Sequence, residues 1–337
     1  MPIYEYISPF LANDAYVFLP YSGYHRQSGF GVCPIAGGDP ATSLVSQDVV
    51  DYCVQDGNNW VTVYVGANPG EYFEAMCINV VAETNPVWNG LGEGGVTHAD
   101  KRAGMVVDGN YVVTARYSVL TRGFYFDNYA IATGAWNGYT SRGTNKSGVR
   151  WAVVKSGVNS YRLLHSYYGR LYVDHFTRSA VVTADTLLCD FGATWMFGGV
   201  LTLRTTNYII VFAPQYYYGT PTTQRYVIAY LPAGGGALSS WVVVQKIYGA
   251  FAVPGQDIIC YNEDVGEDGY WSYKYTVGGS VELLSEDYVV VAPAAALEDG
   301  TPMAFAVVQD AYGDAYDANN PRRYFLMKLT DGSVTKM

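Results

Sequence analysis

The chain has 337 residues, half of them hydrophobic and 15% charged, so a large core is available and a disordered chain is excluded. Thirty acidic residues against twenty basic ones give a formal net charge of −10. This charge disfavours a nucleic-acid partner or an anionic membrane, and it suits solubility and a basic protein partner.

The residue usage favours strands and turns over helices. The chain contains 32 tyrosines and 37 glycines, and valine is abundant. Aromatic and β-branched residues fit strands, whereas glycine fits turns. No window carries apolar residues at a 3.6-residue period over three turns. The sequence therefore predicts an all-β fold.

One pattern recurs along the chain, and its clearest copy runs from Asp108 to Ala115. It is a short apolar strand entered through a tight turn, and its copies lie 44 to 51 residues apart. The anchor residues of these copies are Tyr16, Trp60, Tyr111, Tyr161, Tyr208, Ile258 and Ala304. A repeat at this spacing indicates one domain, 1–337, with a continuous core.

Each repeat reads as four strands. The first two strands form a hairpin. In the clearest copy the strand at 105–107 leads into the strand at 111–113, and Asp108-Gly109 between them is a strong hairpin signal. The third strand is long and aromatic, and a glycine turn follows it in most repeats. The third strands are predicted at 124–132, 171–177, 224–231, 270–277 and 322–329. The fourth strand returns, as at 240–246 and 280–284.

Four antiparallel strands in a tandem unit of this length are the pattern of a β-propeller blade. The anchors predict a seven-bladed β-propeller of four-stranded antiparallel blades. A strand near Ile3–Ile7 and the last strand, at 333–337, are expected to complete one blade together and close the ring, which removes open edges. A β-helix and two packed sandwiches are the alternatives.

The stretch from Asp127 to Trp136 resembles the third strand, turn and tryptophan of quinoprotein-type propeller blades. The Gly-His and Trp-Asp dipeptides of WD40 blades are absent, and the double glycines follow the third strand, not the second as in kelch blades. The resemblance to the β-propeller superfamily implies the architecture alone and carries over no active-site residues.

The loops between second and third strands are rich in tyrosine, and in a meander they emerge on one face with the connections between blades. Tyrosine offers a rigid contact area with a hydrogen-bonding tip, which suits protein and sugar recognition. We predict a partner or ligand face formed by Tyr21, Tyr24, His25, Tyr167, Tyr168, Tyr216, Tyr217, Tyr218, Tyr312 and Tyr316. Tyrosines within strands are expected to fill the gaps between blades.

No cofactor or metal site is predicted. The scattered cysteines, odd in number and without a CxxC pair, are expected to be free thiols; they are Cys33, Cys53, Cys77, Cys189 and Cys260. The acidic run 310–317 offers hard oxygen ligands for calcium, but it lacks the spacing of an EF-hand, so a solvated loop is expected.

The histidines also fall into no recognised motif. His165 and His175 flank a hairpin and could approach each other, with Asp174 beside His175. Neighbouring residues of a strand point to opposite faces, so Asp174 and His175 are not expected to join in one site.

No nucleophile, base and orienting group form a recognised catalytic pattern, so a non-enzymatic protein is predicted. The first hypothesis is a structural or docking propeller in a larger assembly, in particular a virion or phage-tail-type component that contacts a host receptor. Residues 1–6 lack the start of a secretory signal and no ~20-residue apolar segment exists, which fits synthesis in a cytoplasm and protein partners. The alternatives are a lectin-like glycan-binding propeller and a polysaccharide hydrolase or lyase.

Overall fold

The computed structural model describes strand backbone within 11–105 and, with few gaps, backbone and side chains from Val106 onward. The described residues are 11–12, 16–22, 28–34, 41–45, 49–56, 59–65, 73–79, 87–94, 99–118, 121–130, 136–144, 150–266, 269–294, 296–308 and 324–336. Within these ranges the elements are all strands, which confirms the all-β prediction. No helix in these ranges is long and apolar enough to cross a membrane.

The described strands form seven antiparallel sheets, each built from strands that follow one another in the chain. We number the sheets in chain order. Sheet 1 contains β1 (Leu11–Ala12), β2 (Tyr16–Ser22), β3 (Ser28–Pro34) and β4 (Ala41–Val45). Sheet 2 contains β5 (Val49–Asp56), β6 (Asn59–Val65), β7 (Phe73–Asn79) and β8 (Val87–Gly94). Sheet 3 contains β9 (Ala99–Asp108), β10 (Tyr111–Ser118), β11 (Gly123–Ala130) and β12 (Trp136–Gly143).

The remaining sheets follow the same meander. Sheet 4 contains β13 (Arg150–Gly157), β14 (Ser160–Tyr167), β15 (Arg170–Phe176) and β16 (Val181–Asp190). Sheet 5 contains β17 (Trp195–Phe197), β18 (Leu201–Arg204), β19 (Tyr208–Tyr217), β20 (Thr220–Pro232) and β21 (Val242–Val244). Sheet 6 contains β22 (Lys246–Ala252), β23 (Ile258–Asp264), β24 (Tyr270–Thr276) and β25 (Val281–Ser285). Sheet 7 contains β26 (Tyr288–Ala294), β27 (Met303–Val308), β28 (Tyr324–Lys328) and β29 (Val334–Lys336).

The hairpin at the start of sheet 3 shows why the repeat begins where it does. Asp108 pairs with Tyr111 in the register of β9 and β10, which leaves Gly109 and Asn110 as the two-residue turn. Gly109 has φ +59°, a conformation that glycine adopts without steric cost. The Asp-Gly signal therefore fixes this register. All the anchor residues of the repeat lie in the second strands, β2, β6, β10, β14, β19, β23 and β27.

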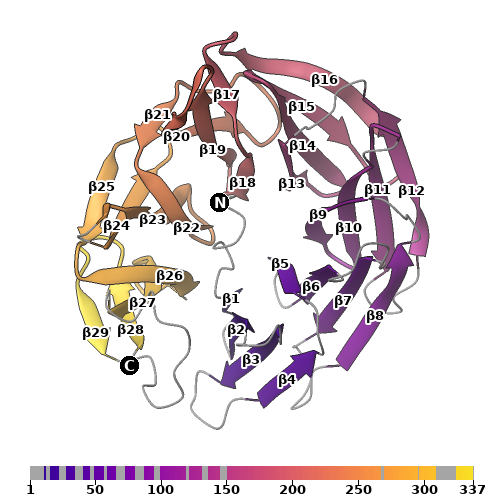
Figure 1. The fold of residues 1–337 in the computed structure, drawn as a ribbon. Coiled ribbons are helices and arrows are strands. Elements are labelled where there is room, and N and C mark those ends of the chain that lie inside the picture. The colour runs from indigo at the N-terminus through magenta and orange to yellow at the C-terminus, as the bar shows by residue number, and fades with distance from the viewer. Residues whose placement is uncertain are drawn as a thin grey trace.

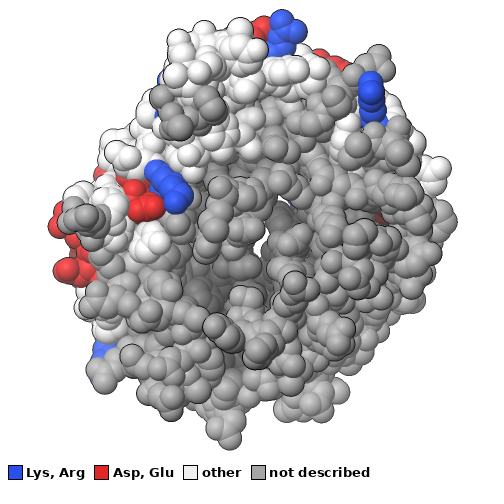
Figure 2. Space-filling model, in the orientation of Figure 1, with Lys and Arg blue, Asp and Glu red and all other residues white. Residues whose placement is uncertain are grey.

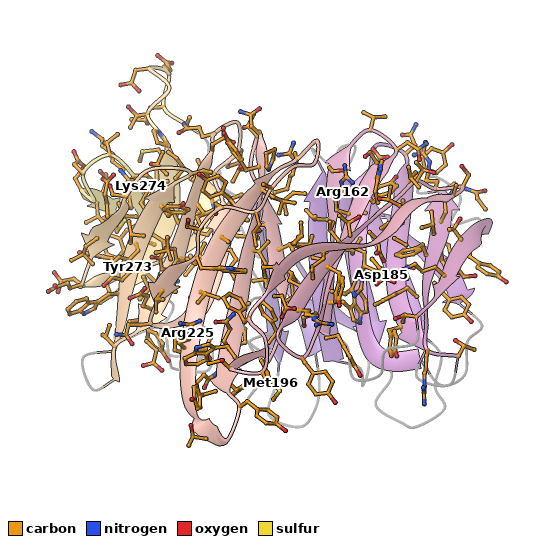
Figure 3. All side chains as sticks on the ribbon, turned by 90° about the horizontal axis from the view of Figure 1, so that it is seen from above. Arg162, Asp185, Met196, Arg225, Tyr273 and Lys274 are labelled. Atoms are coloured by element: carbon orange, nitrogen blue, oxygen red, sulfur yellow. The ribbon has the colours of Figure 1, made fainter. Side chains whose placement is uncertain are left out.

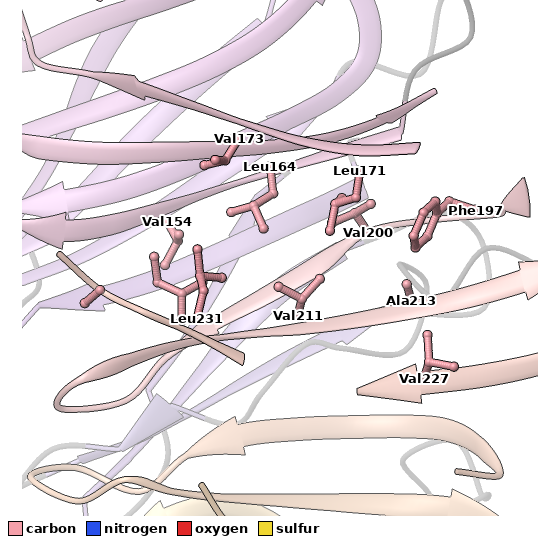
Figure 4. Packing of buried hydrophobic residues seen from close by; sticks show 12 residues of the cluster. Val154, Leu164, Leu171, Val173, Phe197, Val200, Val211, Ala213, Val227 and Leu231 are labelled. Atoms are coloured by element: carbon pink, nitrogen blue, oxygen red, sulfur yellow. The ribbon is translucent and has the colours of Figure 1, made fainter. Parts of the chain in front are cut away.

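The sheets stand side by side around a ring (Figure 1). The apolar core lies between neighbouring sheets, as the cluster between sheets 4 and 5 shows (Figure 4). There Leu164 and Leu171 of sheet 4 pack with Val211 and Leu231 of sheet 5. Several strand tyrosines belong to such inter-sheet clusters; they are Tyr117, Tyr161, Tyr226, Tyr261 and Tyr275.

The closure of the ring by the two chain ends lies partly outside the described residues and stays a prediction. The predicted strand near Ile3–Ile7 lies outside the described residues. Among the described strands, sheet 7 contains strands from the C-terminal repeat alone, and sheet 1 contains strands from the N-terminal repeat alone. β1 contacts β26, so the described parts of the first and last sheets meet through their inner strands.

Sheet 5 departs most from a regular meander. Its first strand is divided into β17 and β18, which both pair with β19. Its fourth strand is predicted at 240–246 but covers Val242–Val244 alone, and Lys246 already begins β22. The chain therefore crosses from the outer edge of sheet 5 into sheet 6 through a single intervening residue.

Candidate functional site

The turn between β14 and β15 presents two tyrosine rings. Tyr167 ends β14 and Tyr168 occupies the turn with φ +53°. Their rings meet edge to face with centroids 4.6 Å apart, and the side chain of Tyr168 is 62% exposed. A non-glycine residue in the left-handed region is held by its surroundings, and here two backbone hydrogen bonds hold the turn.

Those hydrogen bonds come from the connection between sheets 4 and 5 and from β17, the strand that follows it. The amide of Phe191 donates to Gly169 O at 2.9 Å, and the amide of Phe197 donates to Tyr168 O at 3.0 Å. A Cβ on Gly169 would collide with the carbonyl oxygens of Gly192 and Trp195, so glycine is required for this close approach. The turn of sheet 4 and the start of sheet 5 are therefore one packed unit.

The turn between β19 and β20 lies on the other side of this connection. Tyr217 pairs with Trp195 in the register of β17 and β19, and their rings lie edge to face at 5.5 Å. Tyr218 donates its amide to Thr194 O at 3.0 Å. Tyr217 and Tyr218 are 41% and 60% exposed, whereas Tyr216 packs its ring directly on Gly198.

Arg225 of β20 also contacts this group, and Figure 3 labels it near Met196 of β17. Its guanidinium carbon lies 3.9 Å from the centroid of the Trp195 ring, a close cation–π contact. Its Nε donates to Gln215 Oε1 at 2.8 Å. Burial lowers the pKa of Arg225. These contacts fix the orientation of the Trp195 ring.

We call Tyr167, Tyr168, Trp195, Tyr217 and Tyr218 the aromatic face. It brings together residues from two of the predicted loops, and Trp195 joins them although no loop pattern pointed to it. Of the other predicted face residues, Tyr21 lies in β2, whose backbone alone is described. Tyr24, His25, Tyr312 and Tyr316 lie outside the described residues, as does the acidic run 310–317.

A charged cluster joins sheets 3 and 4. Arg142 of β12 donates from Nε to Asp174 Oδ2 at 2.6 Å and from both terminal nitrogens to Asp185 at 3.1 Å. Its Nη2 also lies 3.1 Å from Nε2 of the fully buried His165. Burial alone would lower the pKa of Arg142, but Asp185 and Asp174 raise it.

Among the described residues, this cluster contains a set of three side chains close enough to hold a metal ion together. The donor atoms of His165, Asp174 and Asp185 lie within 4.8 Å of one another. The guanidinium of Arg142 already occupies the space facing both carboxylates, so a cation would have to displace it. The cluster therefore fits an inter-sheet ion pair better than a metal centre.

The histidine arrangement confirms that Asp174 and His175 point to opposite faces of the strand, and the register places His165 opposite Tyr172 and not opposite His175. His165, not His175, approaches Asp174, with Nε2 3.3 Å from Oδ1. His175 pairs with Arg162 across the strands, and its Nε2 lies 3.0 Å from Ser160 Oγ. The alternation of β15 sends Asp174 and His175 to opposite faces.

A second charged group joins the same sheets at the opposite end of the strands. Asp108 accepts hydrogen bonds from the Tyr161 hydroxyl at 2.6 Å and the Asn159 amide at 2.8 Å. Lys155 and Arg178 lie 3.3 and 3.2 Å from its oxygens. Burial raises the pKa of Asp108, but these partners outweigh it and hold the pKa below its usual value.

No family model and no curated protein matches this sequence. Similar solved structures include the β-propeller domain of the Trilobed protease from Pyrococcus furiosus, described as having an open velcro topology. It has 6% identity and a TM-score of 0.57 over 98% of this chain and 97% of that one. The polysaccharide lyase Uly1 has 10% identity and a TM-score of 0.58 over 96% and 90% of the two chains.

Prolyl oligopeptidase B from Galerina marginata is also similar, with 10% identity and a TM-score of 0.53. The alignment covers 89% of this chain and 46% of that longer one. At such identities the likeness shows the fold alone. With its meander sheets around a ring, this chain is a β-propeller.

Proposed function

We propose that this propeller is a non-enzymatic docking module in a larger assembly, of the virion or phage-tail type, and that its aromatic face contacts a protein partner. The observation that supports the proposal is the exposure of Tyr168, Tyr217 and Tyr218 on a rigid base. Tyrosine and tryptophan dominate the binding energy of protein interfaces, because they bury a large area and lose little entropy.

The charge of the chain favours the same kind of partner. A net charge of −10 attracts a basic surface. Arg225 keeps its charge but lies against the Trp195 ring and Gln215, so its guanidinium is not one of the groups that form the face. We therefore expect a partner with basic residues around an apolar centre.

The first test is the mass and a low-resolution image of the purified native material. The proposal expects a particle or a complex of many copies. The double variant Tyr168→Ser/Tyr218→Ser is then expected to enter that assembly at least about 10-fold less well. Tyr139→Ser is the matched control, because Tyr139 is 55% exposed on β12, away from the face.

Three results would contradict the proposal. One is a lone propeller that enters no assembly, and another is a double variant that assembles as well as the control. The third is turnover of a substrate in a broad polysaccharide panel, which would favour the hydrolase or lyase alternative. Uly1 is a polysaccharide lyase with this fold, but the likeness to it is one of architecture.

A further inference from the structure

A cleft of about 680 Å³ opens between sheets 5 and 6. Its walls come from β20 and β21 on one side and from β22 to β25 on the other. The cleft exists because β21 pairs with Tyr226, Val227 and Ile228 of β20 alone, although β20 has 13 residues. The early crossing of the chain into β22 leaves the part of β20 before Tyr226 without a partner in β21. Such a volume suits a small ligand.

Two buried polar groups face this cleft with little or no partner. Tyr261 and Glu263 stand two residues apart on β23, so their side chains share one face of the strand. The Tyr261 hydroxyl is buried and has no hydrogen-bond partner among the described residues. Glu263, 6% exposed, accepts one long hydrogen bond, from the Gln245 amide at 3.3 Å. A buried hydroxyl without a partner has hydrogen-bonding capacity to offer a ligand that reaches it.

The remaining walls combine aromatic, aliphatic and amide groups. The rings of Tyr261 and Tyr273 stack with centroids 5.6 Å apart. Tyr226 faces them from β20, with its hydroxyl accepting a hydrogen bond from Gln224 Nε2 at 3.0 Å. Valines of β21 and β25 complete the apolar part. The cleft thus offers flat apolar surfaces with polar groups between them.

The charges around the cleft do not select a charged ligand. Arg225 and Lys246 line it together with Glu263, and Lys246 lies 3.3 Å from Asp264. Figure 2 shows acidic and basic side chains mixed over the region where Figure 1 draws these strands, and Figure 3 places Arg225 and Tyr273 on the neighbouring sheets. A cationic ligand would be repelled by Arg225 and Lys246, and an anionic ligand would be repelled by Glu263. A neutral polar ligand is repelled by neither group.

We propose that this cleft is a saccharide-binding site. A sugar hydroxyl both donates and accepts, so one ring can donate to Glu263 and bond the Tyr261 hydroxyl. The C–H faces of the ring pack on the tyrosine rings, whose apolar bodies and polar tips suit amphipathic ligands. None of the cleft's lining residues belongs to the aromatic face, although Arg225 also contacts Trp195, and the proposal stands or falls independently of the docking function.

The test uses the purified full chain on a glycan array, followed by calorimetric titration with methyl glycosides of the hexoses and N-acetylhexosamines. At least one saccharide is expected to bind, and Tyr261→Phe and Glu263→Gln are each expected to weaken it about 10-fold or more. Glu298→Gln and Tyr139→Phe are the controls, because both residues are exposed and lie outside both the cleft and the aromatic face, and they are expected to bind like the wild type.

Tyr261→Phe keeps the ring and removes one unpartnered oxygen, so a folding defect will not mimic the expected loss. The absence of any bound saccharide on the array and in titration up to millimolar concentration would overturn the proposal. Binding that neither cleft substitution alters would also overturn it, as would binding of n-butylamine in the cleft without binding of a saccharide. Loss of assembly in the Tyr168→Ser/Tyr218→Ser variant concerns the docking function alone.

Discussion

Two buried tyrosines of this propeller differ in whether their hydroxyl groups have a hydrogen-bond partner among the described residues. Tyr161 and Tyr261 are both fully buried in second strands, β14 and β23. The Tyr161 hydroxyl donates to Asp108 at 2.6 Å, whereas the Tyr261 hydroxyl has no partner among the described residues. Burial is the first cause that raises the pKa of each phenol, so both stay protonated at neutral pH.

Removing each hydroxyl is therefore expected to have different effects on stability. Tyr161→Phe deprives a charged acceptor of its shortest hydrogen bond and should lower the free energy of unfolding by about 1.5–3 kcal/mol. Tyr261→Phe removes a desolvated group without a partner and should leave that free energy unchanged or raise it by about 1 kcal/mol. Denaturant unfolding of the two variants measures the difference. Equal losses would show that the Tyr261 hydroxyl is satisfied in the folded protein.

At the scale of whole strands, polar side chains connect neighbouring sheets at both ends of the interface between sheets 3 and 4. Arg142 of β12 reaches β15 and the positive-φ residue Asp185 of β16. Asp185 donates its amide to Asp174 Oδ1 at 2.6 Å, so the irregular position of the long edge strand is part of the cluster. This irregularity interrupts an otherwise exposed edge, which opposes edge-to-edge pairing.

Replacement of Arg142 tests this connection. Arg142→Leu leaves the buried carboxylate of Asp174 without its cation and should lower the free energy of unfolding by about 3–5 kcal/mol. The double variant Arg142→Leu/Asp174→Leu removes the stranded charge as well, so it should recover part of that loss. Denaturant titration of both variants and of Asp174→Leu measures the coupling. If the losses of the two single variants simply add, the two residues do not act as a pair.

At the scale of the whole molecule, apolar clusters and carboxylates connect neighbouring sheets at more than one of the described interfaces. Asp257, in the hairpin of sheet 6, accepts from the Asn207 amide and side chain, both at 2.7 Å, and from the Thr205 hydroxyl at 2.9 Å. Burial raises the pKa of Asp257, but these hydrogen bonds lower it below the usual value, as at Asp108.

These shifts predict an acid-sensitive ring. A carboxyl whose folded pKa is depressed stabilises the fold fully above its unfolded pKa, about 3.9, and this contribution is lost as pH falls through the folded pKa. The free energy of unfolding should therefore decrease as the pH is lowered below about 4. Asp108→Asn should have a lower free energy of unfolding than the wild type at pH 7, and it should lose less of that free energy on acidification. Thermal unfolding from neutral pH downward measures both slopes. Parallel curves for variant and wild type would contradict this role.

Much of the architecture could be predicted from the sequence, because it depends on local residue types. Strand patterns of aromatic and β-branched residues, with Asp108-Gly109 and related turns between them, locate the hairpins because a turn's φ requirement depends on its own residues. The meander then follows from short connections. The tyrosine-rich loops were visible for the same reason, and Tyr168 and Tyr218 do lie at such turns.

The contacts that matter for binding and stability depend instead on how sheets pack. Arg142 meets partners 32 and 43 residues away, and Arg178 meets Asp108 across 70 residues, separations at which no local pattern exists. Whether Tyr261 has a partner, and whether β21 stops at Val244, depends on where the neighbouring sheet stands. Local residue types set the strands and turns, but the cleft and the ion pairs arise from surfaces that meet only when the ring is assembled.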